Sequence, residues 1–131
     1  MTDRVFLDAN VLFSAAWLED AGIARLWRLT GVTLITSRYA VGEADRNLDT
    51  DAQRVRLHTL TKDMTLIDAP HEAGLPDGVE LVAKDAPILL AAIESRATHL
   101  LTGDRTHFGS LYGRKIGGVK IMPPAVYLKQ R

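Results

Sequence analysis

The sequence predicts an α/β fold in which a mostly parallel sheet is covered by helices on both faces. Three observations lead to this prediction. Short apolar segments of strand length alternate with segments whose apolar residues recur at helical spacing, an order typical of parallel sheets. One helical segment, residues 88–93, is apolar almost all round, as expected of a well-buried helix. The chain has 131 residues, 47% of them hydrophobic, which suits one core. We therefore expect residues 1–131 to form a single domain.

The first third of the chain predicts a strand, two helices and a second strand. Residues 4–8 (RVFLD) form a short buried strand. A helix follows, because apolar residues continue at helical spacing: Val11, Leu12, Ala15, Ala16 and Leu18. Gly22 allows a break, and residues 23–30 predict a second helix that Gly31 ends. The apolar face of this helix consists of Ile23, Leu26, Trp27 and Thr30. Residues 32–36 (VTLIT) are the next strand.

The middle of the chain predicts two helices followed by a strand. Ser37 has the side chain of a helix N-cap, and residues 38–48 (RYAVGEADRNL) follow it as a helix. A more polar helix covers residues 53–62, and residues 64–68 (MTLID) read as a strand. Residues 69–78 (APHEAGLPDG) carry turn residues and predict a loop.

The last third predicts one more buried helix, two strands and a terminal helix. The buried helix begins near Asp85 and ends by Ala97, and a strand follows at about 98–102. After a loop, residues 119–122 (VKIM) form the last strand. Residues 123–130 begin a short helix with proline in its first turn. The sequence contains no internal repeat, low-complexity segment or interdomain linker.

The composition argues against a disulfide scaffold, a thiolate metal site and a membrane protein. The sequence contains no cysteine, which fits a reducing cytoplasm. It has no apolar run of the ~18 residues needed to span a bilayer, so we expect no membrane association. The N-terminus lacks the basic segment and long apolar stretch of a secretory signal peptide.

The formal net charge is zero, from 16 basic and 16 acidic residues, but the charges are unevenly placed. Residues 1–104 contain 10 Lys or Arg and 16 Asp or Glu, whereas residues 105–131 contain 6 Lys or Arg and no acid. A basic segment of this kind can attract phosphates. It can equally be a set of solvated charges without a partner, and the charge count leaves both interpretations open.

Four acidic residues fall where the predicted sheet would present a ligand site. Ligands of open α/β sheets bind beyond the carboxyl ends of the strands. Asp8 ends the first strand, Asp104 lies just past a later strand, and Asp85 begins the buried helix. Glu43 lies about two turns into the third predicted helix, from which its side chain can point back across the same edge.

Each acid also has a local explanation. Asp8 and Asn10 can cap the helix that follows, and Asp85 is well placed as an N-cap or first-turn acid. Asp104 can belong to a turn, and Glu43 can be a solvated helix residue. Four carboxylates at one edge would, however, repel one another, and a bound cation or a shifted protonation relieves the cost. Oxygen ligands without cysteine or histidine favour Mg²⁺ or Mn²⁺, and two such ions can support an in-line phosphoryl displacement by water.

The sequence resembles the PIN-domain ribonucleases in four segments: FLDANVL, SRYAVGEADRNL, KDAPILLAAI and LLTGDRTHF. It is most similar to the small single-domain members, which include VapC-type toxins, and the resemblance extends from Arg4 to about Leu128. It implies a three-layer α/β/α sandwich and Mg²⁺- or Mn²⁺-dependent cleavage of RNA by metal-activated water. For the toxin of a type II toxin–antitoxin pair, it also implies a cognate antitoxin protein and a homodimer.

The resemblance assigns the catalytic and metal-binding roles to four acids: Asp8, Glu43, Asp85 and Asp104. The three aspartates would hold an ion, and Glu43 would help to hold or orient a second ion or the attacking water. Asn10 matches the polar residue two positions after the first acid. Thr102 matches the hydroxyl residue of the TGD-like motif.

The sequence departs from the family just past the TGD-like motif. The family often has a further acid there, where this chain has Arg105, Thr106, His107 and Phe108. This departure puts a second metal position in doubt. His107 is either a substrate contact or a packing residue. Since an acidic site alone would repel RNA, basic residues would have to steer the substrate, and the candidates are Arg105, Arg114 and Lys115.

Other functions are weighed on the same residues. A receiver-like switch would have two adjacent acids after the first strand, and a phosphatase would have a DxD-like motif. The segment LDAN contains neither. A non-toxin PIN nuclease remains an alternative, as does a catalytically silent RNA- or metal-binding module, although all four acids are present. An apolar set comprising Leu18, Ile23, Leu26 and Trp27 is either a partner surface or part of the core. We favour the core, because amphipathic helices usually bury such a face.

Overall fold

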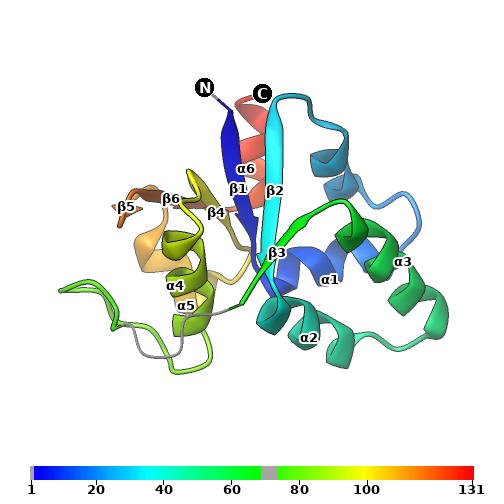
Figure 1. Ribbon diagram of the computed structural model, residues 1–131, viewed down its shortest axis with the longest axis horizontal. Helices are drawn as coiled ribbons and strands as arrows, with labels where there is room; N and C mark the ends of the chain where they lie inside the picture. The colour runs from blue at the N-terminus through cyan, green and yellow to red at the C-terminus, as the bar shows by residue number, and fades with distance from the viewer. Residues whose placement is uncertain (1, 69–73) are drawn as a thin grey trace.

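A computed structural model describes residues 2–68 and 74–131, and within them the chain forms one six-stranded sheet (Figure 1). The strand order is β3-β2-β1-β4-β6-β5. Neighbouring strands are parallel except for β5 and β6, so the predicted mostly parallel sheet is confirmed. The strands are β1 (Asp3–Leu7), β2 (Val32–Ser37), β3 (Thr65–Ile67), β4 (His99–Leu101), β5 (Lys115–Ile116) and β6 (Val119–Met122).

The helices occupy the connections between the strands, except for α6, which follows the last strand. The α-helices are α1 (Ala9–Trp17), α2 (Arg38–Asn47), α3 (Asp51–Lys62), α4 (Ala86–Glu94), α5 (Arg105–Phe108) and α6 (Pro124–Lys129). Two 3₁₀ helices accompany them, η1 (Gly22–Arg28) and η2 (Gly109–Leu111). Local sequence explains several starts. Ser37 accepts a hydrogen bond from the backbone of Ala40, and Thr50 and Gln53 form a capping box at the start of α3.

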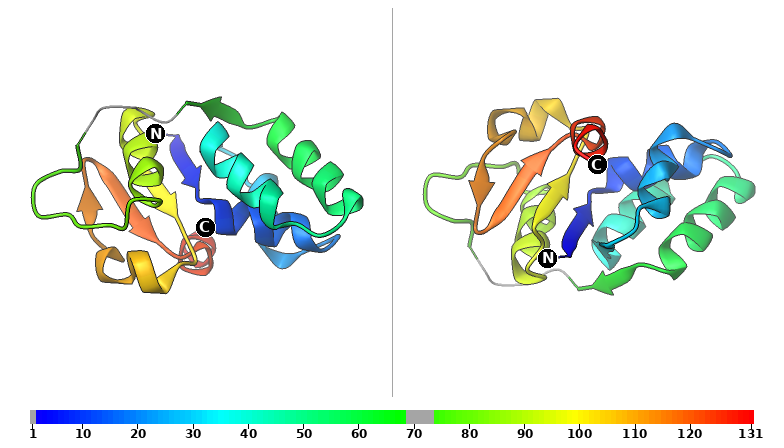
Figure 2. Two further views of the ribbon diagram at one scale, coloured as in Figure 1. Left: turned by 90° about the horizontal axis from the view of Figure 1, so that it is seen from below. Right: turned by 90° about the horizontal axis from the view of Figure 1, so that it is seen from above.

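The helices lie on both faces of the sheet and complete the three-layer α/β/α sandwich. From β1 the chain moves outward to β2 and β3, then returns across the sheet to β4 and β6. Because parallel crossovers are right-handed, this reversal of direction changes the face that the connecting helix covers. In Figure 2, β4 and β6 run between α4 on one side and α5 with α6 on the other. Helix α1 packs against α2 and α3, and α6 packs beside η1 (Figure 1).

The register brings the carboxyl ends of the central strands to one edge. Phe6 of β1 lies beside Ile35 of β2 and Leu100 of β4. The next residues along the chain are therefore close neighbours at that edge. The backbone N–H of Asp8 confirms this by donating a 3.1 Å hydrogen bond to the carbonyl of Leu101.

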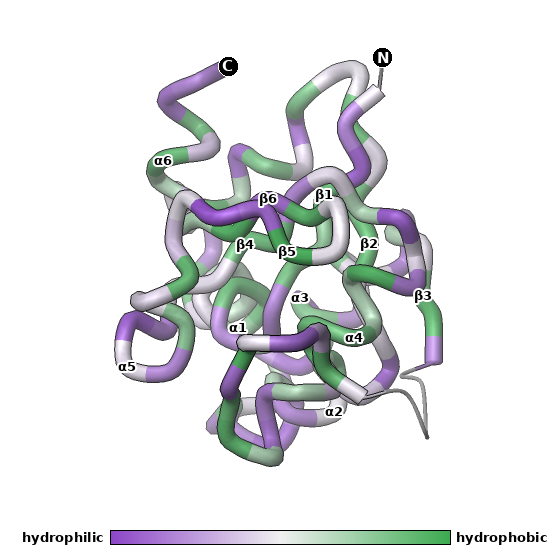
Figure 3. The backbone as a smooth tube through the Cα atoms, turned by 90° about the vertical axis from the view of Figure 1, so that its left-hand side faces the viewer, coloured by the Kyte–Doolittle hydropathy of each residue, from purple (hydrophilic) through white to green (hydrophobic). Residues whose placement is uncertain are grey.

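The core consists of apolar side chains from the sheet and from the inner faces of the helices. The tube is coloured mostly as hydrophobic along β4 and α4, whereas α5 is mostly hydrophilic (Figure 3). The fully buried large side chains include Phe6, Leu12, Leu89, Leu100 and Tyr127. Among the described helices, none has the length and apolar character needed to cross a membrane.

Leu89→Ala is expected to lower the free energy of unfolding by about 2–5 kcal/mol, because Leu89 of α4 is fully buried and its truncation leaves a cavity. Urea denaturation followed by circular dichroism measures the change. Val55→Ala is the matched control, since Val55 lies on α3 with 64% of its surface exposed, and we expect a change within about 0.5 kcal/mol there. Equal effects of the two substitutions would contradict the assignment of α4 to the core.

The segment between β4 and β6, predicted as a loop, is more structured than expected. It contains α5, η2 and the edge strand β5. The α5 helix is a single turn, too short to show helical periodicity in the sequence. Strand β5 pairs with β6 through a turn at Gly117 and Gly118, whose φ angles of 56° and 86° favour glycine.

Other predicted bounds are close to those observed. The helix expected over residues 23–30 is the 3₁₀ helix η1, which ends at Arg28. Its i to i+3 hydrogen bonding is shown by the bond from the Ala24 N–H to the Ala21 carbonyl. The strand expected at 98–102 is limited to β4. Of the predicted loop at 69–78, residues 69–73 lie outside the described residues, and residues 74–78 form neither helix nor strand.

The apolar set near the second predicted helix belongs mainly to the core. Leu26 is fully buried, and Ile23 and Trp27 pack partly buried against the core. The Trp27 indole N–H donates a 2.8 Å hydrogen bond to the carbonyl of Leu60. Leu18 differs from the other three because 62% of its surface is exposed.

Candidate active site

Asp8 lies where β1 ends and α1 begins, and it is held there by three hydrogen bonds. Its Oδ1 accepts a 2.6 Å bond from the backbone N–H of Ala9. Its Oδ2 accepts bonds from the Thr102 hydroxyl (2.8 Å) and the Asn10 amide (3.1 Å). Only 4% of the residue is exposed. Asp8 therefore caps α1, as its local explanation predicts, and is at the same time fixed at the carboxyl edge of the sheet.

Asn10 and Thr102 join the loop after β1 to the loop after β4. The Asn10 amide also donates to the Thr102 hydroxyl (3.2 Å), and its Oδ1 accepts from the backbone N–H of Gly103 (2.8 Å). The Thr102 hydroxyl accepts in turn from the backbone N–H of Asp104 (3.1 Å). This network fixes the positions of the two aspartates relative to each other.

Asp104 begins the one-turn helix α5. Its Oδ1 accepts a 3.1 Å hydrogen bond from the backbone N–H of His107. Its Oδ2 lies 2.9 Å from Nδ1 of the same histidine. The two oxygens of Asp104 thus face two different nitrogens of His107, one on the backbone and one on the ring.

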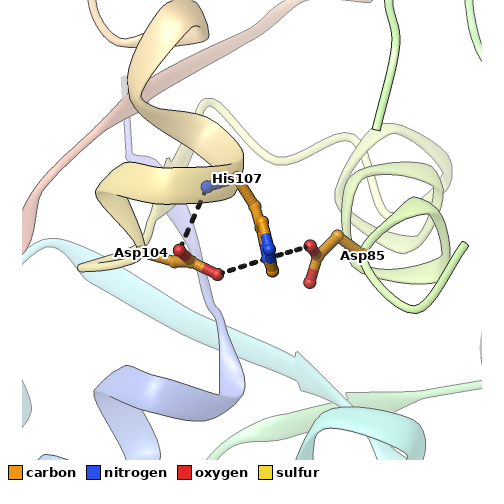
Figure 4. A group of neighbouring side chains, drawn as sticks. All are labelled: Asp85, Asp104 and His107. Carbon is orange, nitrogen blue, oxygen red and sulfur yellow. Dashed lines mark hydrogen bonds and ion pairs between the residues drawn. The ribbon is translucent and has the colours of Figure 1, made fainter. Parts of the chain in front are cut away.

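Asp85 precedes α4, and its side chain makes no capping hydrogen bond to that helix. The expected N-cap bond is therefore absent. Instead, Oδ2 of Asp85 lies 2.7 Å from Nδ1 of His107, within the distance of an ion pair (Figure 4). The side chain of Asp85 is only 9% exposed. Asp85 is thus a buried carboxylate that faces His107 rather than the backbone of its own helix.

A cavity of about 420 Å³ connects the acids. All four predicted catalytic acids line it, together with Asn10. Asp8 and Asp104 follow β1 and β4, Glu43 lies on α2, and Asp85 precedes α4. The remaining lining residues include Phe13 of α1, Asn47 of α2 and the exposed Lys84. The structure therefore brings together the four acids that are widely separated in the sequence.

A scan against models of known protein families finds no match, and a sequence search of curated proteins finds none either. Among solved structures, the chain is similar to the crystal structure of Mycobacterium tuberculosis VapC20, a toxin that cleaves the sarcin-ricin loop. The TM-score is 0.55 at 17% sequence identity, over 76% of this chain and 91% of that chain. This chain has a VapC-like PIN fold. At such low identity the likeness concerns the fold, and any activity has to be argued from the side chains.

Burial dominates the electrostatics of the acids in this PIN fold. It raises the pKa of Asp8 to about 6, although the hydrogen bonds from Thr102 and Ala9 oppose the shift and the charges of Asp85 and Glu43 add to it. Burial also raises the pKa of Glu43, with a further contribution from the charge of Asp85. The pKa of Asp85 is raised by burial as well, and the neighbouring His107 opposes that shift.

The donor set of the PIN cavity fits a divalent cation. Carboxylate oxygens are the ligands that Mg²⁺ and Mn²⁺ prefer. Among the described residues, Oδ2 of Asp85 is buried without a hydrogen-bond partner, which is costly for a carboxylate unless a cation neutralises it. Asp85, Asp104 and His107 each offer one ligand atom, and these atoms lie within 4.8 Å of one another. Asp8 and Glu43 lie outside this tight group but line the same cavity.

The predicted basic contacts lie in different places on the PIN fold. Arg105 is exposed at the start of α5, directly after Asp104. Arg114 and Lys115 are exposed at the edge strand β5 and are absent from the described lining of the cavity. His107 contacts two of the acids, Asp85 and Asp104. The sequence suggests either a substrate contact or a packing residue, and neither describes this position.

Sequence reasoning missed Lys84, a basic residue that lines the same cavity as the acids. Its charge lowers the pKa of both Glu43 and Asp85. Its carbonyl accepts a 2.7 Å hydrogen bond from the Tyr39 hydroxyl, which anchors the backbone at this point. The signal in the sequence was its position directly before Asp85, since a neighbour of a site residue often lines the same cavity.

Proposed function

We propose that the protein is a metal-dependent endoribonuclease that hydrolyses RNA phosphodiesters. The observation that carries this proposal is the convergence of four acids from separate segments on one cavity, at the carboxyl edge of a VapC-like PIN fold. The similarity to VapC20, a toxin that cleaves the sarcin-ricin loop, supports the same reaction class. It also supports the narrower proposal that the chain is the toxin of a type II toxin–antitoxin pair.

Each side chain has a distinct role in the proposed reaction. Asp8, Asp85 and Asp104 would hold the ion, and Glu43 would orient the attacking water or help to hold a second ion. A bound Mg²⁺ or Mn²⁺ supplies activation of a water molecule and stabilisation of the charge that develops at the phosphate. The hydrolysis forms a bond from the water oxygen to phosphorus and breaks the P–O bond to the leaving nucleotide; the water gives up a proton, and the leaving oxygen takes up a proton from solvent. Because the pKa of Glu43 is raised, its carboxylate is well suited to accept a proton from that water.

Positive charge on the protein would bring the RNA to this acidic cavity. Lys84 lines the cavity and Arg105 adjoins Asp104, so both are suitably placed to contact phosphates beside the ion. Arg114 and Lys115 lie farther along the sheet edge and would contact phosphates outside the cavity. Such contacts add affinity without reading base sequence.

Incubation of the purified protein with a total RNA pool, with Mg²⁺ or Mn²⁺ and with EDTA, tests the proposed reaction. We expect cleavage only with the ion, and mapping the new ends identifies the sites. Absence of cleavage despite measurable ion binding would favour a catalytically silent PIN module.

The partner proposals need separate measurements. Induced expression in a bacterial host should arrest growth, and co-expression of a small protein encoded directly upstream should relieve the arrest if that protein is the antitoxin. Sedimentation analysis tests the proposed homodimer. Cleavage without growth arrest would instead favour a non-toxin PIN nuclease.

Replacing both Arg114 and Lys115 by Ala should weaken the salt dependence of RNA binding. If each makes one phosphate contact, the slope of log affinity against log salt falls in magnitude by about 1.4, because each contact to single-stranded RNA contributes about 0.7. Fluorescence anisotropy with labelled RNA in EDTA measures this slope. Lys62→Ala, an exposed position at the end of α3, is the control and should leave it unchanged. An unchanged slope in the double variant would remove β5 from the RNA contact surface.

A further inference from the structure

His107 occupies the position between two carboxylates that the proposed function assigns to metal binding. We propose that Nδ1 of His107 is itself a ligand of the divalent ion held by Asp85 and Asp104, so that the site favours Mn²⁺ or another first-row transition-metal ion over Mg²⁺. The inference rests on the proposed function only for the presence of an ion at this cavity. It adds the ligand and the class of metal.

The ring nitrogen lies where a third ligand would lie. Nδ1 of His107 is 2.7 Å from Oδ2 of Asp85 and 2.9 Å from Oδ2 of Asp104 (Figure 4). Two ligands at right angles on one ion, each about 2.1 Å from it, are about 3.0 Å apart. The observed separations are within a few tenths of an ångström of this value. All three ligand atoms lie within 4.8 Å of one another, so an ion can bind them once the ring moves aside from between the two carboxylates.

The ring is directed into the site by the backbone of α5. The His107 backbone N–H donates to Oδ1 of Asp104, three residues earlier, which closes the single turn of this helix. This bond leaves Oδ2 of Asp104 facing the imidazole. Because the backbone and the ring of His107 use different oxygens of Asp104, a metal ion can take Oδ2 without breaking the helix cap.

The protein contacts of the ring leave ligand capacity unused. Nδ1 of His107 and Oδ2 of Asp85 are both buried, and neither has a hydrogen-bond partner of acceptable geometry among the described residues. Their contact at 2.7 Å therefore does not satisfy either atom as a hydrogen bond would. The Asp85 side chain is more than nine-tenths buried, so water cannot readily satisfy the free oxygen. A cation between the three residues would satisfy both atoms.

The identity of the third ligand decides which ions the site selects. Mg²⁺ is a hard ion that takes oxygen ligands, whereas imidazole nitrogen suits first-row transition-metal ions. An all-carboxylate site therefore favours Mg²⁺ more than a site with two carboxylates and one histidine does. This chain carries the histidine just past TGD, where the sequence resemblance would place an acid. A histidine in place of an acid at this position accordingly shifts the expected metal preference toward Mn²⁺.

Electron spin-echo spectroscopy of the Mn²⁺-loaded full-length chain, without RNA, tests the ligand directly. We expect modulation from a directly bound ¹⁴N nucleus, and its replacement by a ¹⁵N pattern when the protein is labelled with ¹⁵N-histidine. The labelling experiment uses the unsubstituted chain and so does not depend on the folding of a variant. Mn²⁺ binding without nitrogen modulation would overturn the inference, as would the absence of any bound Mn²⁺.

Substitution assigns the nitrogen to His107. His107→Gln should remove the modulation, whereas His58→Gln, at an exposed position on α3, should retain it. Calorimetric titrations give the ratio of the Mg²⁺ dissociation constant to the Mn²⁺ dissociation constant. This ratio should fall by at least about tenfold in His107→Gln, because mutating even a residue that supports a metal ligand typically costs 10–100-fold in metal affinity. His107→Asp should lower the ratio further by supplying an oxygen.

The outcomes separate this inference from the nuclease proposal. Nitrogen ligation in a protein that cleaves no RNA would support the metal site and contradict the ribonuclease. RNA cleavage with Mn²⁺ bound through oxygen alone would support the ribonuclease and make His107 a clamp between two acids. An unchanged metal preference in both His107 variants would likewise overturn the inference.

Discussion

Asp8→Asn is expected to reduce metal-dependent RNA cleavage by at least about 100-fold, because an ion ligand in the reaction contributes several kcal/mol to the transition state. Asp8 is the choice among the four acids because its position is the most tightly specified. Three hydrogen bonds hold it, and it lies at the end of the central strand β1. The measurement is the rate of cleavage of a mapped RNA site at saturating Mg²⁺ or Mn²⁺.

The variant should keep the native fold. Asparagine has the shape of aspartate, and its oxygen can still accept the bond from the backbone N–H of Ala9. Its amide would lose the hydrogen bonds that the Thr102 hydroxyl and the Asn10 amide donate to Oδ2, a local cost of about 1–3 kcal/mol that leaves the apolar core unchanged. Circular dichroism and an unfolding curve check this point. Asp49→Asn, at an exposed position before α3, is the control and should retain the wild-type rate. Asp8→Asn with more than half of the wild-type rate would contradict the role of Asp8.

The sequence was sufficient to predict the sheet and the acids because both depend on local patterns. Each parallel strand is a short apolar run. Two of the acids follow strands, one begins a helix and one lies on a helix, and all four line the cavity at the same edge of the sheet. Once the alternation of strands and helices is read, the rule that strand ends meet at one edge brings Asp8 and Asp104 together. Their hydrogen-bonded connection through Asn10 and Thr102 agrees with this expectation.

The position of His107 could not be predicted in the same way. Its ring reaches Asp85 only because α5 makes a single turn after Asp104, and one turn leaves no periodic signal in a sequence. Which oxygen faces the ring depends on a cap bond inside that turn. Strand β5 was missed for a different reason. It has two residues, and only the paired glycines Gly117 and Gly118 indicate the hairpin.

The cavity that we propose as an ion site is also expected to cost stability in the absence of an ion. Burial raises the pKa of Asp8 from 3.8 to about 6 in the folded protein. Between these two pH values the folded state binds more protons than the unfolded state, so the free energy of unfolding falls as the pH rises. The contribution of Asp8 is fully present below about pH 4 and is lost as the pH passes 6. A difference of about 2 in the pKa of Asp8 between the folded and unfolded states corresponds to about 3 kcal/mol in the free energy of unfolding.

The difference between wild type and Asp8→Asn isolates this contribution from those of all other groups. In EDTA, the stability of the variant relative to wild type should increase by about 2–3 kcal/mol from pH 4 to pH 7, because asparagine does not ionise. The same comparison with Asp49→Asn, an exposed acid, is the control for the loss of one carboxylate outside the cavity. Urea unfolding at four pH values provides the measurement. A difference that is independent of pH would show that Asp8 is ionised as readily in the folded as in the unfolded chain.

Added ion should stabilise wild type more than Asp8→Asn at pH 7. A ligand that binds only the folded state stabilises it by RT ln(1 + [L]/Kd), about 2.7 kcal/mol at a concentration 100 times Kd. Wild type should gain this amount from Mn²⁺, whereas Asp8→Asn should gain much less because it lacks one carboxylate of the cavity. Since metal ligands must be deprotonated, the gain in wild type should also diminish below pH 6, where Asp8 takes up a proton. Stabilisation by Mn²⁺ that is equal in both proteins, or undiminished at pH 5, would place the ion away from Asp8.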